Sequence, residues 1–374
     1  MIYLDNAATT PIYDCAIRAA NDSMRNRYFN PNTTYSSGVG VRNDIERARR
    51  SIANAIGTAS DELVFTSCAT ESNNWAINNG RKNIKGNIVV SAGEHASVYE
   101  PAAALASRGV DVRFVPLDRS GAIDISAFRA AVDEHTSLVS VIHVSNETGV
   151  INPIKQLVSI VRERAPRALF HSDGVQGLLK TDEPIKSLGV DLYSASAHKI
   201  GAPKGIGLLY IKKGVNIAPY ILGGGQENGR RSGTQNTPYI AAFASAVENF
   251  KSLADNEKTS RLRSELARFF EERGCTVIGD GACSGYILCV CIPNVKAEIL
   301  QNIVHDRGVI IGKGAACSGS KRGNRVLEAM KLNGKQIESC VRISLFTDTA
   351  PADAMEAAKI ICDAAERIRR GNVG

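Results

Sequence analysis

The amino-acid sequence predicts an α/β protein with a mostly parallel sheet in a large domain and a smaller α+β domain after it. The first observation is that short β-branched runs alternate with stretches of helical periodicity between residues 40 and 250. This order is typical of a parallel sheet with helices on both faces. The second is a change of order beyond residue 256, where strands and helices are mixed. The length of 374 residues leaves room for two hydrophobic cores.

Seven runs of the first region are expected to form its sheet: LVFTS, NIVVSA, DVRFVPL, SLVSVIHVS, RALFHSDG, LYSASA and GIGLLYI. Helical patterns such as Ile154–Arg164 lie between several of them. We place the large domain at 13–253 and the small domain at 1–12 together with 254–374. In open sheets of this kind ligands gather at the carboxyl ends of the strands, so the polar residues that follow the strands are the candidates for a site. In the small domain we expect strands at 286–292, 309–311 and 340–345, and helices at 297–307, 324–332 and 350–369.

The sequence argues against two classes of protein, membrane-spanning proteins and secreted proteins. No stretch approaches the roughly 18–20 apolar residues of a membrane-spanning helix, and the N-terminus lacks the basic and apolar layout of a secretory signal. The net charge of +7 comes from scattered basic residues, mostly in helical stretches. That pattern favours solvated helix faces over a nucleic-acid surface. We therefore expect a cytoplasmic protein that has neither a membrane nor a nucleic acid as a direct partner.

The nine cysteines lack any C-x-x-C or Cys/His metal spacing, which indicates a reducing compartment and predicts no metal site. Cys289 and Cys291 stand two apart in an apolar run, so one face of a strand would carry both. We interpret this pair as core packing, with metal binding as the alternative. Cys317 is treated below, and the others have no chemical context in the sequence and are interpreted as packing residues: Cys15, Cys68, Cys275, Cys283, Cys340 and Cys362.

Asp173 and Lys199 end neighbouring predicted strands and together suggest a cofactor. A lysine at a strand end among small residues loses solvent, and burial lowers its pKa toward nucleophilic use. Pyridoxal phosphate (PLP) requires a lysine that holds its aldehyde covalently and often a carboxylate that keeps its ring nitrogen protonated. Gln176 follows Asp173 closely enough to donate a hydrogen bond to the ring oxygen. Taken alone, Lys199 would be interpreted as a surface lysine.

The phosphate and the ring face of such a cofactor also need partners. After strand LVFTS the chain enters a helix whose first N–H groups, at Ala69 and Thr70, would suit a phosphate together with the Thr70 hydroxyl. The alternative is an ordinary helix cap. Ser196 and His198 offer further hydrogen-bonding groups for an oxyanion. His95 follows strand NIVVSA and offers an imidazole that could stack on the ring, although a lone histidine is more often structural.

Taken together, these segments resemble the cysteine desulfurases, PLP enzymes of the aspartate-aminotransferase-like fold (fold type I). The resemblance covers most of the chain in the family's order. It implies PLP as the cofactor, L-cysteine as the substrate and a homodimer as the assembly. The matching stretches are YLDNAATTP, TSCATESNN, GEHAS, VSNETGVINPI, HSDGVQ, SASAHKIGAPKGIG, GGGQENGRRSGTQN, GAACSGS and VRISL.

Carried over position by position, the resemblance implies a role for each residue around the ring. Lys199 holds the cofactor covalently and removes the α-proton of the substrate. Asp173 pairs with the pyridine nitrogen, and Gln176 faces the ring oxygen. His95 stacks on the ring and assists the proton transfers.

The resemblance also implies how two anionic groups are held. Asn146 and Arg342 bind the substrate carboxylate, a role that suits the planar guanidinium of arginine, and Asn146 is also implied to contact the cofactor. The alternative for Arg342 is an ordinary edge-strand arginine. The phosphate is implied to be bound by Ala69, Thr70, Ser196 and His198, joined by Thr234 of the partner subunit.

Cys317 lies in a segment of glycine, serine and other small residues at about 312–324, a composition typical of a mobile loop and not of core. Nearby lysines favour its thiolate form. The resemblance implies that this thiolate takes the sulfur of L-cysteine, which leaves alanine and a persulfide. The segment resembles the longer-loop class of the family (group I), whose cysteine passes sulfur to an acceptor protein.

The segment departs from the usual Ser-Ser-Gly-Ser-Ala-Cys pattern by reading Ile-Gly-Lys-Gly-Ala-Ala-Cys, which leaves the identity of the acceptor open. Four basic residues surround the cysteine: Lys313, Lys321, Arg322 and Arg325. Our hypothesis is that they attract an acidic acceptor protein. The sequence does not choose among iron–sulfur cluster assembly, thiolation and DNA phosphorothioation as the destination of the sulfur.

Two further functions remain open at this point. A selenocysteine lyase, another PLP-dependent lyase or an aminotransferase could use the same fold. From a different class, the chain could be a non-catalytic scaffold of a sulfur-transfer complex. The joint presence of Lys199, Asp173, Arg342 and Cys317 argues against the scaffold.

Overall fold

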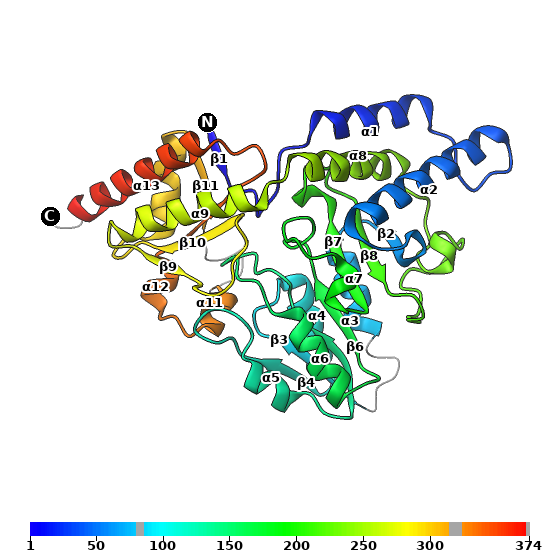
Figure 1. Cartoon of the computed structure of the whole chain (residues 1–374), viewed down its shortest axis with the longest axis horizontal. Coiled ribbons are helices and arrows are strands. Elements are labelled where there is room, and N and C mark those ends of the chain that lie inside the picture. The colour runs from blue at the N-terminus through cyan, green and yellow to red at the C-terminus, as the bar shows by residue number, and fades with distance from the viewer. Residues whose placement is uncertain (80–85, 314–323, 372–374) are drawn as a thin grey trace.

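The computed structural model describes residues 1–79, 86–313 and 324–371 and confirms the predicted fold class, with two sheets covered by helices (Figure 1). The strands are β1 (Ile2–Leu4), β2 (Leu63–Thr66), β3 (Asn87–Ser91), β4 (Val112–Val115), β5 (Thr136–Ser140), β6 (Leu169–Asp173), β7 (Leu192–Ser196), β8 (Gly207–Ile211), β9 (Thr276–Ile278), β10 (Ile287–Cys291), β11 (Val309–Lys313) and β12 (Cys340–Ser344).

The helices are α1 (Asp14–Asn26), α2 (Ser36–Ile56), α3 (Ala69–Asn79), α4 (Ala96–Ala106), α5 (Ile125–Ala131), α6 (Ile154–Arg164), α7 (Ile185–Leu188), α8 (Thr237–Leu253), α9 (Asn256–Glu271), α10 (Ala297–Asp306), α11 (Arg325–Ala329), α12 (Gly334–Glu338) and α13 (Pro351–Gly371). The described residues also form short 3-10 turns, namely η1 (Ser60–Glu62), η2 (Ala197–Lys199) and η3 (Glu227–Gly229). No helix in the described ranges combines the length and the apolar character needed to cross a bilayer.

The larger sheet has seven strands in the order β2-β8-β7-β6-β5-β3-β4. Strand β8 runs antiparallel to both of its neighbours, β7 and β2. The other pairings in this sheet are parallel. The carboxyl ends of β2, β3, β5, β6 and β7 therefore lie along one edge, and the residues that follow these strands are brought together there.

Each face of the larger sheet has its own core, because successive strand residues point to opposite sides. Val89 of β3 packs in a cluster with residues of α1, α2, α5, α6 and α8. Its neighbours Ile88 and Val90 pack with residues of α3 and α4 on the other face. Helices on both faces, as predicted, leave the carboxyl edge as the accessible part of the sheet.

The smaller sheet has the order β1-β11-β12-β10-β9. Strand β1 is parallel to β11, with Ile2 opposite Val309, although the two strands are far apart in the sequence. Helices α9, α10 and α13 cover one face. After β1 the chain crosses to α1 beside the larger sheet (Figure 1). The N-terminal strand thus joins the sheet of the C-terminal region, which is the arrangement that the proposed domain division assumes.

Cys289 and Cys291 share one face of β10 and pack with Cys340 against α11 and α12. Their exposed fractions are 0% and 5%, which confirms the interpretation as core packing. Within the described ranges, no group of three or more His, Cys, Asp or Glu side chains is arranged to hold a metal ion.

Candidate functional site

Residues that follow the parallel strands converge on one cavity of about 310 Å³. Its walls come from the larger sheet, from the segment after β1 and from β12 of the smaller sheet. The predicted site residues that line it are Ala69, Thr70, His95, Asn146, Asp173, Gln176, Ser196, His198, Lys199 and Arg342. Sequence reasoning missed the other lining residues, which are Ala7, Ala8, Cys68, Ser97, Ile142 and Val175.

Asp173 ends β6 with its side chain buried, only 2% exposed. Its Oδ1 accepts a hydrogen bond of 3.0 Å from the backbone N–H of Val175, and its Oδ2 accepts one of 2.7 Å from Nδ2 of Asn73 in α3. A flipped Asn73 amide would set an acceptor against an acceptor, so this orientation is fixed by chemistry. A Cβ added to Gly174 would lie 1.8 Å from the ring of Tyr193, so only glycine lets the turn after Asp173 lie against the sheet.

A chain of hydrogen bonds joins the Asp173 carboxylate to the His95 imidazole. Asn73 Nδ2 also donates to Ser97 Oγ at 2.8 Å, and Ser97 Oγ lies 2.8 Å from His95 Nδ1. The backbone N–H of Ser97 donates to the same Nδ1, which therefore carries no proton. Burial, the largest cause, lowers the pKa of His95 against the opposing effect of Asp173. The ring is accessible from the cavity and offers its Nε2–H as a donor.

Glu94, directly before His95, is a buried acid that the sequence did not single out. Its Oε1 accepts a hydrogen bond of 2.5 Å from the backbone N–H of Ile142. Burial, with a further contribution from Asp173, raises its pKa well above the ordinary value. The neutral form of Glu94 is thus favoured more than it would be in an exposed glutamate, because burial and the Asp173 carboxylate both oppose a second negative charge at this place.

Arg325 supports the same turn from the other side, which corrects its assignment to the basic residues that would attract an acceptor protein. Its guanidinium donates to the backbone carbonyls of Ala92 and Glu94 and lies 3.9 Å from the centre of the Tyr99 ring. An arginine occupied by two carbonyls and an aromatic face stabilises the His95 turn. Lys321 and Arg322 lie outside the described residues.

Lys199 ends η2, the turn that follows β7, and is half-buried. Its Nζ donates to the backbone carbonyls of Ala7 at 2.6 Å and Ala8 at 2.8 Å. Both carbonyls belong to the segment after β1. The N-terminal segment therefore supplies the acceptors that hold the amine at the cavity wall.

Gln176 is oriented by a second buried lysine, Lys180, which the sequence did not reveal. Lys180 Nζ donates to Gln176 Oε1 at 3.2 Å, and Gln176 Nε2 donates to the Ala7 carbonyl at 2.9 Å. An ammonium only donates and a carbonyl only accepts, so both neighbours require the same amide orientation. Burial, and then the charge of Lys199, lower the pKa of Lys180 to about 7. The amide thus presents a nitrogen, a donor, to the cavity.

Another group of lining residues offers donors for an anion. Ala69 and Thr70 open α3, so that free backbone N–H groups point from the helix start. Ser196 ends β7, and His198 follows it with Nδ1 3.1 Å from Thr9 Oγ1. Burial and the charge of Lys199 lower the pKa of His198 to about 3, so its ring is neutral at physiological pH.

Cys68, directly before Ala69, also lines the cavity, which corrects its interpretation as a packing residue. The signal that could have found it is its place directly before the predicted anion-binding turn. A cysteine at the end of a strand in this sheet belongs with the polar residues that follow it as a candidate for the site.

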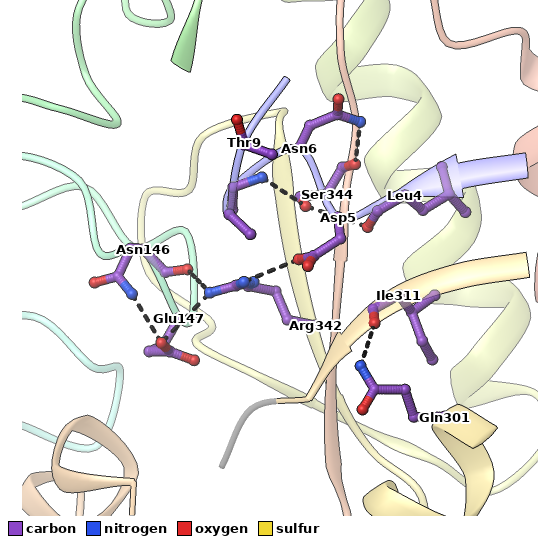
Figure 2. Close-up of polar contacts among 12 residues, drawn as sticks. Leu4, Asp5, Asn6, Thr9, Asn146, Glu147, Gln301, Ile311, Arg342 and Ser344 are labelled. Carbon is purple, nitrogen blue, oxygen red and sulfur yellow. Dashed lines mark hydrogen bonds and ion pairs between the residues drawn. The ribbon is translucent and has the colours of Figure 1, made fainter. Parts of the chain in front are cut away.

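Arg342 stands in β12 with its guanidinium between two carboxylates and is buried, 7% exposed (Figure 2). It donates to Asp5 Oδ1 at 2.9 Å, to the Asn146 carbonyl at 2.9 Å and to Glu147 Oε1 at 3.4 Å. Asn146 Nδ2 also donates to Glu147 Oε1, at 2.8 Å. The structure thus brings together the two residues predicted to hold a substrate carboxylate and adds two acidic neighbours that were not foreseen.

One predicted site residue among the described ones, Thr234, does not line the cavity. Thr234 is exposed in the loop between β8 and α8, where it lines a separate hollow of about 160 Å³ that also includes Ser67 and Arg231. That position agrees with the expectation that Thr234 acts in the partner subunit, which stays a prediction. Cys317 and most of its expected loop lie outside the described residues.

The donor set of the cavity fits the cofactor that the sequence suggested. Five kinds of group surround the cavity: a fixed carboxylate, a primary amine, an amide N–H, a neutral imidazole, and a helix start with hydroxyl groups. These groups match a protonated ring nitrogen, an aldehyde, a ring oxygen, a ring face and a phosphate, respectively. PLP carries all five features in one molecule.

The profile of the aminotransferase class-V family matches residues 2–355. A cysteine desulfurase of Bradyrhizobium diazoefficiens is 35% identical over 98% of this chain and 95% of its own length. A cysteine desulfurase IscS of Dictyoglomus turgidum is 36% identical over 94% of this chain and 91% of its own length.

Solved structures show the same likeness. A NifS-like protein superposes with a TM-score of 0.89 at 34% identity, covering 97% of this chain and 98% of its own. The structure of SspA in complex with cysteine superposes with a TM-score of 0.81 at 29% identity, covering 94% of this chain and 100% of its own.

Proposed function

Because the chain belongs to the aminotransferase class-V family, we propose that it is a cysteine desulfurase, which removes sulfur from L-cysteine and leaves L-alanine. The single observation that carries the proposal is the cavity where Asp173, Lys199 and Arg342 meet. Those three residues are a ring-nitrogen partner, a covalent anchor and a carboxylate binder. The similarity to curated cysteine desulfurases over nearly the whole chain, and to SspA in complex with cysteine, supports L-cysteine as the substrate.

PLP is the proposed cofactor, and the cavity residues would hold it at four places. Asp173 would pair with the ring nitrogen, and Lys199 would bind the aldehyde carbon. The Gln176 amide N–H would face the ring oxygen. Ala69, Thr70, Ser196 and His198 would bind the phosphate, joined by Thr234 of the partner subunit. When bound, the cofactor supplies an electron-withdrawing ring that stabilises negative charge at the substrate α-carbon.

The chain's own residues would then position the substrate and move its protons. Arg342 and Asn146 would hold the α-carboxylate and thereby fix the position of the α-carbon. With the substrate in place, Lys199 would take the α-proton on Nζ. His95 has its Nδ1 occupied by Ser97, so the proton that it offers to the cavity is the one on Nε2.

Cys317 is the proposed sulfur acceptor. Its thiolate attacks the substrate sulfur, so an S–S bond forms as the substrate C–S bond breaks. The bonding electrons stay with the substrate carbon, which takes up a proton and leaves as alanine. Sulfur is thereby left on Cys317 as a persulfide, which an acceptor protein would collect.

A homodimer in the cytoplasm completes the proposal. Tyr220, Ile221 and Leu222 expose 40%, 37% and 81% of their surface in the same loop as Thr234, and exposed apolar clusters mark contact surfaces. The described cysteines all have free thiols, which suits a reducing compartment.

The test is product analysis with purified holoenzyme and L-cysteine in the presence of a thiol reductant. We expect equal amounts of alanine and sulfide, and loss of both in the Cys317→Ser variant. An aminotransferase would give a 2-oxo acid in place of alanine. A lyase that needs no protein thiol would keep its turnover in Cys317→Ser, and a scaffold would give no product; each of these results would overturn the proposal.

A further inference from the structure

Glu147 accepts hydrogen bonds from the two side chains that are proposed to bind the substrate carboxylate. Its Oε1 accepts hydrogen bonds from Asn146 Nδ2 at 2.8 Å and from Arg342 Nη1 at 3.4 Å (Figure 2). These are the two side chains assigned to the substrate α-carboxylate. A carboxylate oxygen of the protein therefore sits where a carboxylate oxygen of the substrate is expected to bind.

The charges at this corner make simultaneous binding unfavourable. One guanidinium already serves two carboxylates, because Arg342 also pairs with Asp5 at 2.9 Å, and the three side chains sum to one net negative charge. The side chains are largely shielded, with exposed fractions of 9% for Arg342, 20% for Asp5 and 13% for Glu147. A third carboxylate added beside the same guanidinium would meet repulsion that water screens poorly.

Glu147 has a second partner on the side away from the guanidinium. Its Oε2 accepts a hydrogen bond of 3.2 Å from Nδ2 of Asn324, the N-cap residue of α11. A shift of the carboxylate toward Asn324 would release Asn146 Nδ2 and Arg342 Nη1 while the acid keeps a hydrogen bond. Asp5 holds the other nitrogen of the guanidinium, Nη2, so Arg342 would stay in place during the exchange.

We propose that Glu147 is an exchangeable internal counter-ion that competes with the substrate α-carboxylate for Arg342 and Asn146. The inference rests on the proposed function, and it adds a residue that sets substrate affinity. Glu147 would weaken the binding of every ligand with an α-carboxylate, including the product L-alanine, and would thereby favour product release. It would leave ligands that lack this charge unaffected.

Two substitutions should move substrate affinity in opposite directions. Glu147→Gln removes the competing charge and should lower the KM for L-cysteine about fivefold, with kcat within about twofold. Asn324→Asp keeps a good helix cap but replaces the donor to Glu147 with a repelling carboxylate. It should push Glu147 toward Arg342 and raise the KM about threefold. Glu134→Gln, at a residue whose side chain is 79% exposed, changes the net charge equally and should leave KM unchanged.

Calorimetric binding of two ligands separates competition from a general structural effect. L-Alanine carries the carboxylate, and L-alaninamide replaces it with a neutral amide. Glu147→Gln should tighten L-alanine binding about fivefold and leave L-alaninamide binding unchanged. Equal changes for both ligands, or a higher KM for L-cysteine in Glu147→Gln, would overturn the inference, because Glu147 would then position Arg342 and not compete with the substrate.

The binding experiment still tests the role of Glu147 if the protein does not catalyse the proposed reaction. Wild-type enzyme that forms no alanine from L-cysteine would contradict the proposed function, while the comparison of L-alanine with L-alaninamide would still report on Glu147. Unfolding of each variant in urea identifies one that has merely lost its fold. Glu147→Asp then serves as a second variant that keeps the charge with a shorter reach, and we expect its KM to lie between those of the wild type and Glu147→Gln.

Discussion

Two parts of the cavity hold their charges in different ways. We call them the wall, formed by Asp173 with Asn73 and Val175, and the corner, formed by Arg342 with its acidic neighbours Asp5 and Glu147. Asp173 is 2% exposed and is fixed by two neutral donors, the Asn73 amide and the Val175 N–H. Arg342 is shared among Asp5, Glu147 and a backbone carbonyl, and two of these three partners are charged. The difference suggests that a group that must stay in place is held by neutral hydrogen bonds, whereas a group that must bind and release a ligand has exchangeable ionic partners.

The wall should tolerate substitution least. Asp173→Asn keeps the shape of the side chain but replaces the carboxylate, so the ring nitrogen loses its anionic partner. We expect turnover of L-cysteine to fall about a hundredfold or more. Steady-state alanine formation measures the loss, and the visible absorbance of the cofactor shows whether it is still bound. Near-normal turnover with bound cofactor would show that the Asp173 carboxylate is not needed for the reaction. It would also contradict the view that the wall holds a group that must stay in place.

At the corner, Arg342→Lys keeps the charge and removes the forked geometry. The expected result is a KM for L-cysteine raised about tenfold, because an ammonium lacks the fixed fork that lets one side chain donate to Asp5 and to the substrate carboxylate at the same time. The kcat should change less than the KM. A loss confined to kcat would mean that Arg342 acts on the reacting atoms and not on the binding of the substrate carboxylate.

The neutral donors of the wall can be tested one at a time. Asn73→Ala leaves Oδ2 of Asp173 without its amide donor, and we expect cofactor affinity to fall about fivefold. Asn78→Ala is the matched control, since the Asn78 amide donates to a carbonyl within α3 and does not line the cavity. Fluorescence titration of apoprotein with PLP gives both dissociation constants. Equal losses in the two variants would point to damage of α3 alone.

Lys180 is predicted to act on the stability of the protein and not on catalysis, and the sign of its effect is opposite to that of the wall residues. Its pKa is lowered to about 7 in the folded protein, so between pH 7 and 10 the unfolded chain binds the additional proton. The stability contributed by this site therefore rises with pH in that window, and below pH 7 burial of the charge is fully destabilising. We expect Lys180→Met to stabilise the apoprotein by about 2 kcal/mol at pH 6.5 and by progressively less toward pH 10.

Urea unfolding of the apoprotein at several pH values measures this effect. A pH-independent difference between Lys180→Met and wild type would show that Lys180 does not titrate in this range. The same variant should bind PLP more weakly, because the Gln176 amide loses the partner that fixes its orientation.

Much of this arrangement was predictable from the sequence, and the missing parts have a common physical cause. Alternating strands and helices predicted the larger sheet, and its topology then placed Asp173, Lys199 and His95 at one edge. Motif residues were therefore found by their types and their places after strands. The residues that orient these motif residues, Asn73 and Lys180, were not found. They lie in a helical pattern and in a turn, where nothing in the sequence distinguishes them from packing residues.

The corner was least predictable because its parts are distant in the sequence. Asp5 reaches Arg342 only because β1 pairs with β11 in the smaller sheet, next to β12. The expected grouping of residues 1–12 with the small domain did not say which strand β1 would pair with. Arg325 was misinterpreted for a similar reason, since its charge suggested a surface role while the fold directs it to two carbonyls behind His95.

Sulfur transfer to Cys317 is tested most directly by a single turnover of holoenzyme with one equivalent of L-cysteine, followed by mass spectrometry of the peptide that contains Cys317. We expect one alanine released per active site and a peptide heavier by one sulfur atom at Cys317. Alanine released without that added sulfur, or sulfur found on another cysteine such as Cys68, would contradict the proposed transfer.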